Sequence, residues 1–175
     1  MAFAWYFAYG SNMQRATFSG RRGISYNRAL AARIAGWRIA FDKMPLFPIG
    51  ESFATLVADP HGEALGVLYE IGAEELAHVE LTEGVLIGNY ERATVTATPL
   101  LPLPEKTVNA VTLVSSRRRE GMRPSRRYMD LLIEGAREHQ LPESYVAFLR
   151  AVPAQPDSAR SKLLRPLIDA AMRHR

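Results

Sequence analysis

Two short stretches of the sequence combine residues that could carry out chemistry. The first, Tyr9-Gly10-Ser11-Asn12-Met13, follows an aromatic and apolar run that suits a buried strand. Gly10 permits backbone angles closed to other residues, and Ser11 and Asn12 favour turns and helix N-caps. A strand that ends here and leads into a short helix over 13–18 would leave backbone N–H groups unpaired. Such groups bind an anion or a developing oxyanion.

The second stretch places one acidic residue, Glu83, at the end of an expected helix and next to Gly84. A carboxylate is poorly placed at the negative end of a helix dipole, and Val79, Leu81 and Val85 are its apolar neighbours in the sequence. Apolar surroundings would raise the pKa of the carboxyl group, as a general base needs. Glu83 is therefore a candidate general base. A solvated glutamate beside a C-capping glycine is the alternative that this pattern leaves open.

The composition offers little support for other kinds of site. The 175 residues include no cysteine, which excludes disulfides, thiolate catalysis and cysteine metal ligands. The chain has four scattered histidines: His61, His78, His139 and His174. Their spacing suits no metal, so we expect no metal site. Ser11 is not expected to act as a nucleophile, because no nearby sequence supplies a general base.

The net charge of +4 is compatible with an acidic substrate or with nucleic acid. The chain lacks a recognised nucleic-acid-binding motif, so a nucleic-acid partner is not expected. We interpret Arg117, Arg118 and Arg119 as a solvated loop, with a rim that attracts an acidic substrate as the alternative. The apolar N-terminal run has no Lys or Arg before it and is interrupted at Gly10. We therefore expect no signal peptide and no membrane span, and a cytoplasmic protein; the oligomeric state is not indicated.

Strands are expected in the first two-thirds of the chain and helices in the last third. After the opening strand, alternation and β-branched residues predict strands within 28–42, 52–59, 64–71, 91–99 and 107–115. The first of these ranges is expected as two short strands kinked at Gly36. Pro60-His61-Gly62 predicts a hairpin-like turn, and a Pro-containing turn is expected over 100–105.

Helical spacing and capping residues predict helices over 73–83, 125–140, 141–152 and 158–175. Ser125 is the expected N-cap of the second helix, and Pro166 is expected to interrupt the last one. We therefore predict an α+β fold in one domain over residues 1–175, with residues 153–175 as a C-terminal helical extension.

Three motifs, in the same order along the chain, resemble the γ-glutamylcyclotransferase-like (AIG2-like) family. They are Tyr9-Gly10-Ser11-Asn12-Met13, Glu83-Gly84-Val85 followed by Gly88-Asn89-Tyr90, and Pro124-Ser125-Arg126-Arg127-Tyr128 leading to Gly135-Ala136 and Leu141-Pro142. With weaker matches at 36–41 and 66–69, the resemblance runs from about Trp5 to about Leu149. It implies a small mixed β-barrel, closed or nearly closed, with helices packed outside and a pocket at one mouth.

The resemblance also implies an activity, the release of an amino acid or amine from a small γ-glutamyl compound with 5-oxoproline as the other product. The family's catalytic acid/base corresponds to Glu83. The γ-glutamyl pocket is lined by the loop that corresponds to Tyr9–Met13, and Tyr90 and Tyr128 correspond to tyrosines near the site. No metal or other cofactor is implied.

Alternatives remain within and beyond this family. One is an enzyme of the same fold that acts on γ-glutamylamines or on another acylated metabolite. Glutathione is less expected as the substrate, because the loop reads Ser11-Asn12 rather than the Ser-Leu of glutathione-specific relatives. A basic barrel that binds nucleic acid is a more distant alternative, as is a barrel that has kept its pocket without turnover.

Overall fold

The computed structural model describes residues 3–101 and 106–173. In these ranges a closed barrel is built from five strands: β1 (Phe3–Ala8), β2 (Arg28–Lys43), β3 (Phe53–Gly72), β4 (Glu91–Pro99) and β5 (Val108–Val114). The order around the barrel is β1-β3-β2-β4-β5. β1 and β5 pair in parallel, and the other neighbouring strands are antiparallel. The predicted mixed barrel is therefore confirmed. The turn expected over 100–105 lies mostly outside the described residues.

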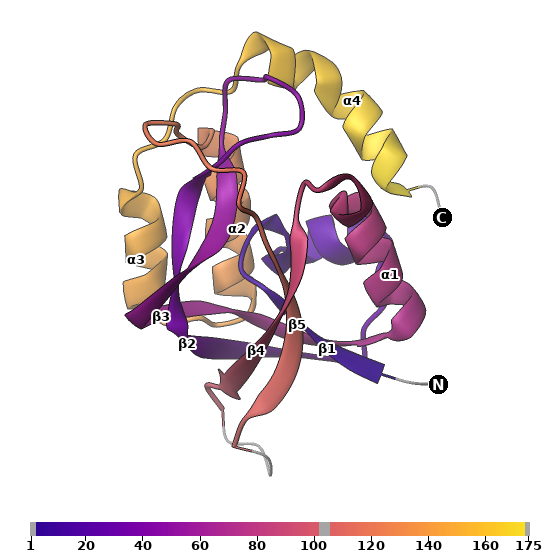
Figure 1. Cartoon of the computed structure of the whole chain (residues 1–175), viewed down its shortest axis with the longest axis vertical. Coiled ribbons are helices and arrows are strands. Elements are labelled where there is room, and N and C mark those ends of the chain that lie inside the picture. The colour runs from indigo at the N-terminus through magenta and orange to yellow at the C-terminus, as the bar shows by residue number, and fades with distance from the viewer. Residues whose placement is uncertain (1–2, 102–105, 174–175) are drawn as a thin grey trace.

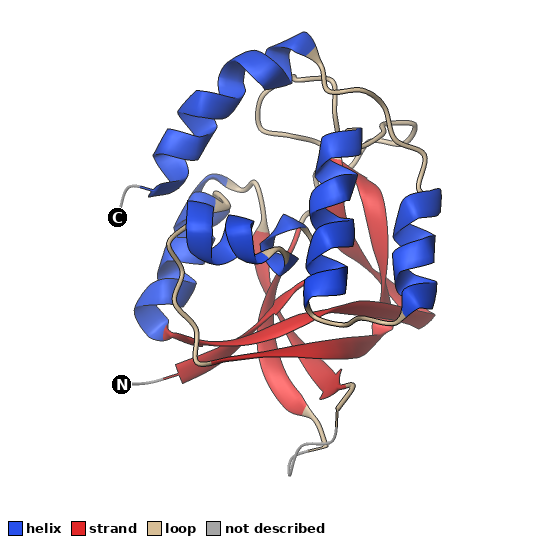
Figure 2. Cartoon of the chain, turned by 180° about the vertical axis from the view of Figure 1, so that it is seen from behind, coloured by secondary structure: helices blue, strands red, loops and turns tan. Residues whose placement is uncertain are grey.

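Four α-helices pack outside this barrel: α1 (Ala73–Thr82), α2 (Arg126–Glu138), α3 (Glu143–Ala151) and α4 (Ala159–Arg173). Figures 1 and 2 show α2 and α3 side by side on one side of the barrel and α1 on the other side, with α4 across one end of the molecule. Three short helical turns, Ser11–Met13, Ala16–Arg21 and Val85–Ile87, lie in the connections. The predicted α+β fold is confirmed.

β2 and β3 are long continuous strands, where the sequence suggested shorter ones. Both halves of β3 pair with the same neighbour, and the register passes from Ala35↔Glu63 to Trp37↔Ala58. Residues 59–62 therefore form a bulge opposite Gly36, and the predicted hairpin-like turn at Pro60-His61-Gly62 is wrong. The chain does not reverse direction here, because β2 provides the backbone hydrogen bonds for both halves of β3. Gly36, with φ of +81°, supplies the kink without ending the strand.

The predictions for the helices were mostly correct. Ser125 caps α2, because its Oγ accepts a hydrogen bond from the Tyr128 N–H at 3.2 Å. The single helix expected over 13–18 is instead a 3₁₀ turn over 11–13 followed by a π turn over 16–21. The interruption expected at Pro166 is also wrong, since α4 continues through it. A proline removes one backbone hydrogen bond, a loss that this surface helix tolerates.

The residues from 3 to 173 that the structure describes include no helix with the length and apolarity needed to cross a membrane. The division into one domain with an extension from residue 153 stays a prediction.

The chain after β1 is held against α2 by a close backbone contact. A Cβ atom built on Gly135 would lie 2.6 Å from both the Gln14 backbone nitrogen and the Met13 carbonyl carbon. Only glycine allows α2 to approach this closely. Met13 is fully buried beneath the contact, and its carbonyl accepts a hydrogen bond from the Tyr69 hydroxyl at 3.0 Å. The position of the 9–13 loop therefore depends on the packing of α2.

We predict that Gly135→Ala destabilises the protein by about 1 to 3 kcal/mol, because the added methyl group forces α2 away from residues 13–14. Urea unfolding would measure the change. Gly20→Ala is the matched control, since a Cβ there meets nothing within 4 Å. A Gly135→Ala variant as stable as Gly20→Ala would contradict the close-packing argument.

Candidate active site

A cavity of about 470 Å³ opens at the end of the barrel beneath α4. Its wall contains seven of the residues predicted for the site: Tyr9, Gly10, Ser11, Asn12, Glu83, Tyr90 and Tyr128. Met13, the remaining predicted residue, does not line the cavity. Its side chain is fully buried in the core behind the loop, so the prediction that it contacts substrate is not supported by its position.

The fold brings Glu83 to the loop after β1 by a simple geometric route. β1 pairs antiparallel with β3, so the end of β3 at Gly72 lies beside the start of β1 at Phe3. α1 begins directly after β3, and its 10 residues extend for about 15 Å. This length carries the chain back along β1, whose 6 residues span about 20 Å. Glu83, which follows α1, therefore lies near the residues that follow β1.

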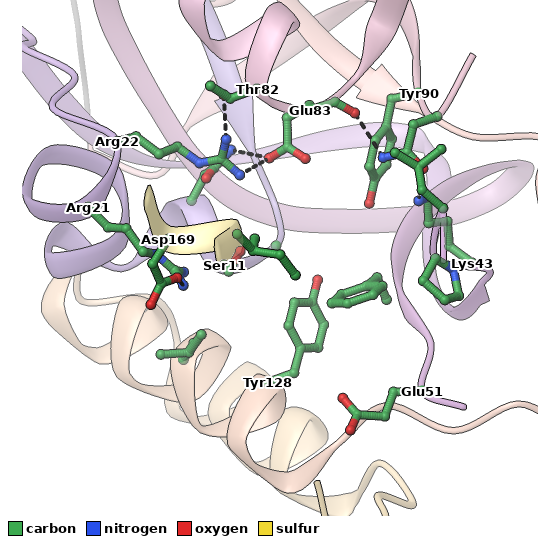
Figure 3. Close-up of a pocket in the computed structure, with 18 of the residues that line it drawn as sticks. Ser11, Arg21, Arg22, Lys43, Glu51, Thr82, Glu83, Tyr90, Tyr128 and Asp169 are labelled. Atoms are coloured by element: carbon green, nitrogen blue, oxygen red, sulfur yellow. Dashed lines mark hydrogen bonds and ion pairs between the residues drawn. The ribbon is translucent and has the colours of Figure 1, made fainter. Parts of the chain in front are cut away.

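The Glu83 carboxylate is held through one of its oxygens. Oε1 accepts hydrogen bonds from Arg22 Nη2 at 2.5 Å and from Asn12 Nδ2 at 3.1 Å. Oε2 has no hydrogen-bond partner among the described residues. The glutamate side chain is 19% exposed and the arginine side chain 3% exposed, so the ion pair is largely shielded from water. Figure 3 shows the carboxylate between Arg22 on one side and Tyr90 on the other.

The surroundings of Glu83 are less apolar than the sequence suggested. Among its apolar neighbours in the sequence, Val79 is fully buried and Val85 is half-buried, whereas Leu81, Leu86 and Ile87 are exposed. The groups that contact its carboxylate are a guanidinium and an amide, both of which donate hydrogen bonds to Oε1. Gly84, with φ of +75°, ends the helix and turns the chain back toward the cavity.

Arg22 is a site residue that the sequence analysis missed. Its guanidinium donates to the Thr82 hydroxyl at 2.5 Å as well as to Glu83. Its backbone carbonyl is hydrogen-bonded by a ring nitrogen of His78, which fixes the arginine against α1. Its partner is 61 positions away in the sequence, so no local pattern could have revealed the pair.

Three predicted tyrosines line the cavity, and their hydroxyl groups contact the barrel backbone. Tyr90 donates to the Ala54 carbonyl at 3.0 Å, and Tyr128 accepts from the Ala54 N–H at 3.1 Å. The Tyr9 hydroxyl donates to the Leu113 carbonyl. Burial raises the pKa of all three hydroxyls well above the ordinary value, so they stay neutral hydrogen-bonding groups.

Tyr128 also sits directly over Gly10. A Cβ atom at Gly10 would be 3.1 Å from the Tyr128 hydroxyl oxygen. The glycine therefore allows the loop backbone and the hydroxyl to share the same edge of the cavity.

Several further charged residues line the cavity without having been predicted, among them Lys43 and Glu51. Lys43, at the end of β2, donates to Asn89 Oδ1 at 2.5 Å. Glu51 accepts a hydrogen bond from the Ser158 N–H at 2.6 Å and ties the 44–51 loop to the segment before α4. In contrast, the Arg117–Arg119 run contributes no residue to the cavity wall. Arg118 instead forms an ion pair with Asp42 at 2.7 Å.

Within the described ranges, no three His, Asp or Glu side chains come together as a metal site would require.

Comparisons with known proteins find relatives of one kind. The sequence model described as the AIG2-like family matches residues 63–149. A γ-glutamyl cyclotransferase from Aspergillus oryzae, aclK, is 33% identical over 165 residues, which cover 83% of this chain and 60% of that protein. The chain thus spans 60% of the length of this relative. A γ-glutamylcyclotransferase from Bos taurus is 26% identical over 170 residues, which cover 94% of this chain and 85% of that protein.

Solved structures share the fold. A structure of a γ-glutamyl cyclotransferase matches with a TM-score of 0.78 and 22% identity, covering 97% of this chain and 99% of that chain. The human protein loc79017, described as uncharacterized, matches with a TM-score of 0.79 and 22% identity, covering 96% and 99% of the two chains. These matches extend beyond the barrel to nearly all of the chain.

The shielded ion pair generates a stability prediction. Arg22→Gln should lower the free energy of unfolding by about 2 to 4 kcal/mol, because it leaves a partly buried carboxylate without its cation. A fully buried carboxylate would cost more. Urea unfolding would measure the loss.

Arg28→Gln is the control for this prediction. It removes an ion pair with Glu70 at 2.9 Å whose arginine is 49% exposed, and such surface pairs contribute less than about 1 kcal/mol. Equal losses in the two variants would mean that the Arg22 pair is no better shielded than a surface pair.

Proposed function

We propose that this chain is a γ-glutamylcyclotransferase, because the AIG2-like family model matches residues 63–149 and a γ-glutamyl cyclotransferase is 33% identical to it. It releases an amino acid or amine from a small γ-glutamyl compound and leaves the glutamyl part as 5-oxoproline. The observation that carries the proposal is the position of Glu83, whose carboxylate lies in the cavity wall with one oxygen fixed by Arg22 and Asn12.

The reaction joins two parts of one molecule. The α-amine nitrogen of the glutamyl group attacks its own γ-carbonyl carbon, and the amide bond to the leaving nitrogen then breaks. Because nucleophile and electrophile are already connected, the enzyme gains most by folding the glutamyl chain and holding it so that the two atoms meet. A cavity of about 470 Å³ is large enough for a molecule of this size.

Glu83 moves the proton in this proposal. The α-ammonium group must lose one proton before it can attack, and its nitrogen loses a second proton as the lactam ring forms. The leaving nitrogen must gain a proton before it departs as an amine, and the remaining proton passes to that amine or to solvent. The same carboxylate serves as base and then as acid. Transfer from an ordinary α-ammonium group, with a pKa of about 8, to an ordinary carboxylate, with a pKa of about 4.3, is uphill by about 5 kcal/mol. Exclusion of water by the bound substrate would reduce this difference.

Asn12 and Arg22 position the base. Asn12 Nδ2 donates both to Glu83 Oε1 and to the Tyr6 hydroxyl, at 3.1 Å each. This fixes the side-chain amide and leaves its buried Oδ1 without a partner among the described residues. With Oε1 engaged, Oε2 is the oxygen that exchanges the proton.

The loop after β1 and two tyrosines complete the proposed binding site. The backbone amides of Gly10, Ser11 and Asn12 bind either the tetrahedral oxyanion or the substrate α-carboxylate. Tyr90 and Tyr128 hold the glutamyl chain between them, with their hydroxyls anchored at Ala54. The tyrosines act as neutral walls and hydrogen-bonding groups, and no step requires a metal or a nucleotide. We further propose a cytoplasmic location.

We predict that Glu83→Gln lowers kcat/KM for 5-oxoproline formation at least about a hundredfold, the low end for loss of a general acid or base. Purified protein is incubated with a set of γ-glutamyl dipeptides and γ-glutamylamines, and 5-oxoproline is quantified by mass spectrometry. Glu80→Gln, one turn earlier on α1, is the matched control. Its carboxylate pairs with Arg92 and does not line the cavity.

The possible outcomes test the role of Glu83 and the proposed reaction separately. Loss of turnover in Glu83→Gln with nearly unchanged turnover in Glu80→Gln would support both. Turnover that survives in Glu83→Gln would remove the glutamate from the mechanism. No 5-oxoproline from any substrate would contradict the proposed function.

A further inference from the structure

Lys43 is a buried cation in the cavity wall that the proposed mechanism does not use. The residue is 1% exposed, and its Nζ lies 4.5 Å from the centre of the Tyr90 ring and 5.9 Å from that of Phe53. Nζ donates to Asn89 Oδ1, and no carboxylate lies within ion-pair distance of it among the described residues. Burial lowers its pKa to about 8, with the charge of Glu83 opposing this shift and that of Arg117 adding to it.

Most other cations along the cavity have a carboxylate partner. Arg21 pairs with Asp169 at 2.8 Å and Arg22 with Glu83 at 2.5 Å. Arg165 pairs with Asp157. Arg127 forms no ion pair with the described residues either, but it is only half-buried, so water can solvate it.

Lys43 is thus a desolvated ammonium whose one hydrogen-bond acceptor is a neutral amide. Of its three N–H donors, one is used by Asn89. A buried charge with so little compensation is costly by itself, and an anionic group in the cavity would remove that cost.

The position of Lys43 relative to Glu83 indicates which anion it would meet. Asn89 links the two, because its Nδ2 donates to the Glu83 carbonyl at 2.8 Å while its Oδ1 accepts from Lys43. Figure 3 shows Lys43 and Arg22 on opposite sides of the Glu83 carboxylate. Lys43 also begins the 44–51 loop, whose Leu46 and Phe47 form an apolar part of the cavity wall.

The leaving nitrogen must come within reach of Glu83 to receive its proton. In a γ-glutamyl amino acid, the carboxylate of the leaving group is separated from this nitrogen by one carbon atom. A leaving amino acid whose nitrogen faces Glu83 can therefore direct its carboxylate to Lys43 and its side chain toward the apolar 44–51 loop.

We propose that Lys43 binds the carboxylate of the departing amino acid and is the residue that makes the enzyme select γ-glutamyl amino acids over γ-glutamylamines. This inference rests on the proposed cyclotransferase function and decides between its two substrate classes.

The test uses two substrates that differ in one group. γ-Glutamyl-alanine and γ-glutamyl-ethylamine have the same glutamyl part and leaving nitrogen, but only the first has a carboxylate on the leaving group. Wild-type protein should prefer γ-glutamyl-alanine by about tenfold to a hundredfold in kcat/KM, as expected for a hydrogen bond to a charged group. Lys43→Met should lower kcat/KM for γ-glutamyl-alanine by that factor and for γ-glutamyl-ethylamine by no more than about threefold.

Two further variants make the result interpretable. Lys43→Gln removes the charge but can still donate to Asn89, so it should show the same loss of preference if Lys43→Met does not fold. Lys162→Met makes the same chemical change at an exposed position of α4 outside the cavity wall, and it should keep the wild-type preference.

Each outcome bears on the inference. A wild-type enzyme that turns over both substrates equally would overturn it without any variant. Equal losses on both substrates in Lys43→Met would place the lysine on the glutamyl carboxylate or in a structural role, and would overturn it too. If neither γ-glutamyl-alanine nor γ-glutamyl-ethylamine gives 5-oxoproline, the proposed function is overturned, and this inference with it.

Discussion

The site depends on one shielded electrostatic contact, between the Arg22 guanidinium and the Glu83 carboxylate. A carboxylate at the C-terminal end of a helix faces the unfavourable end of the helix dipole, and a nearby positive charge offsets this cost. Arg22, 3% exposed, supplies that charge, and Asn12 adds a neutral hydrogen bond to the same oxygen. The second oxygen, Oε2, has no hydrogen-bond partner among the described residues, and it is the oxygen that we propose exchanges the proton.

The barrel makes this contact possible because it places the ends of strands and helices that are distant in the sequence at the same mouth. Antiparallel pairing of β1 with β3 sets the start of α1 beside the start of β1, and the length of α1 then returns the chain to the end of β1. Ala54 of β3 fixes two tyrosines of the cavity through its N–H and its carbonyl. The close approach of α2 at Gly135 holds the 9–13 loop in place. The catalytic proposal thus rests on pairing and packing at several separate points.

Features of the site could be predicted from the sequence when they lie in a short continuous motif, and not when they depend on contacts between distant residues. The Tyr9–Met13 motif and Glu83 are recognisable because each lies in a short characteristic stretch. The fold inferred from these stretches is confirmed, and the model of the family that they resemble matches residues 63–149. Arg22 and Lys43 were missed because their importance comes from burial and from distant partners, which no local pattern encodes. The bulge at 59–62 was taken for a turn because Pro, His and Gly favour both, and only the pairing with β2 decides between them.

In the proposed reaction, the glutamyl group is released by attack of its own amine and not by water. The most direct measurement is turnover of γ-glutamyl-alanine in water enriched in ¹⁸O, with the products identified by mass spectrometry. Intramolecular attack predicts 5-oxoproline and alanine, both free of ¹⁸O, because no water oxygen enters either product. Formation of glutamate with ¹⁸O in its side-chain carboxylate would show hydrolysis and would contradict the account.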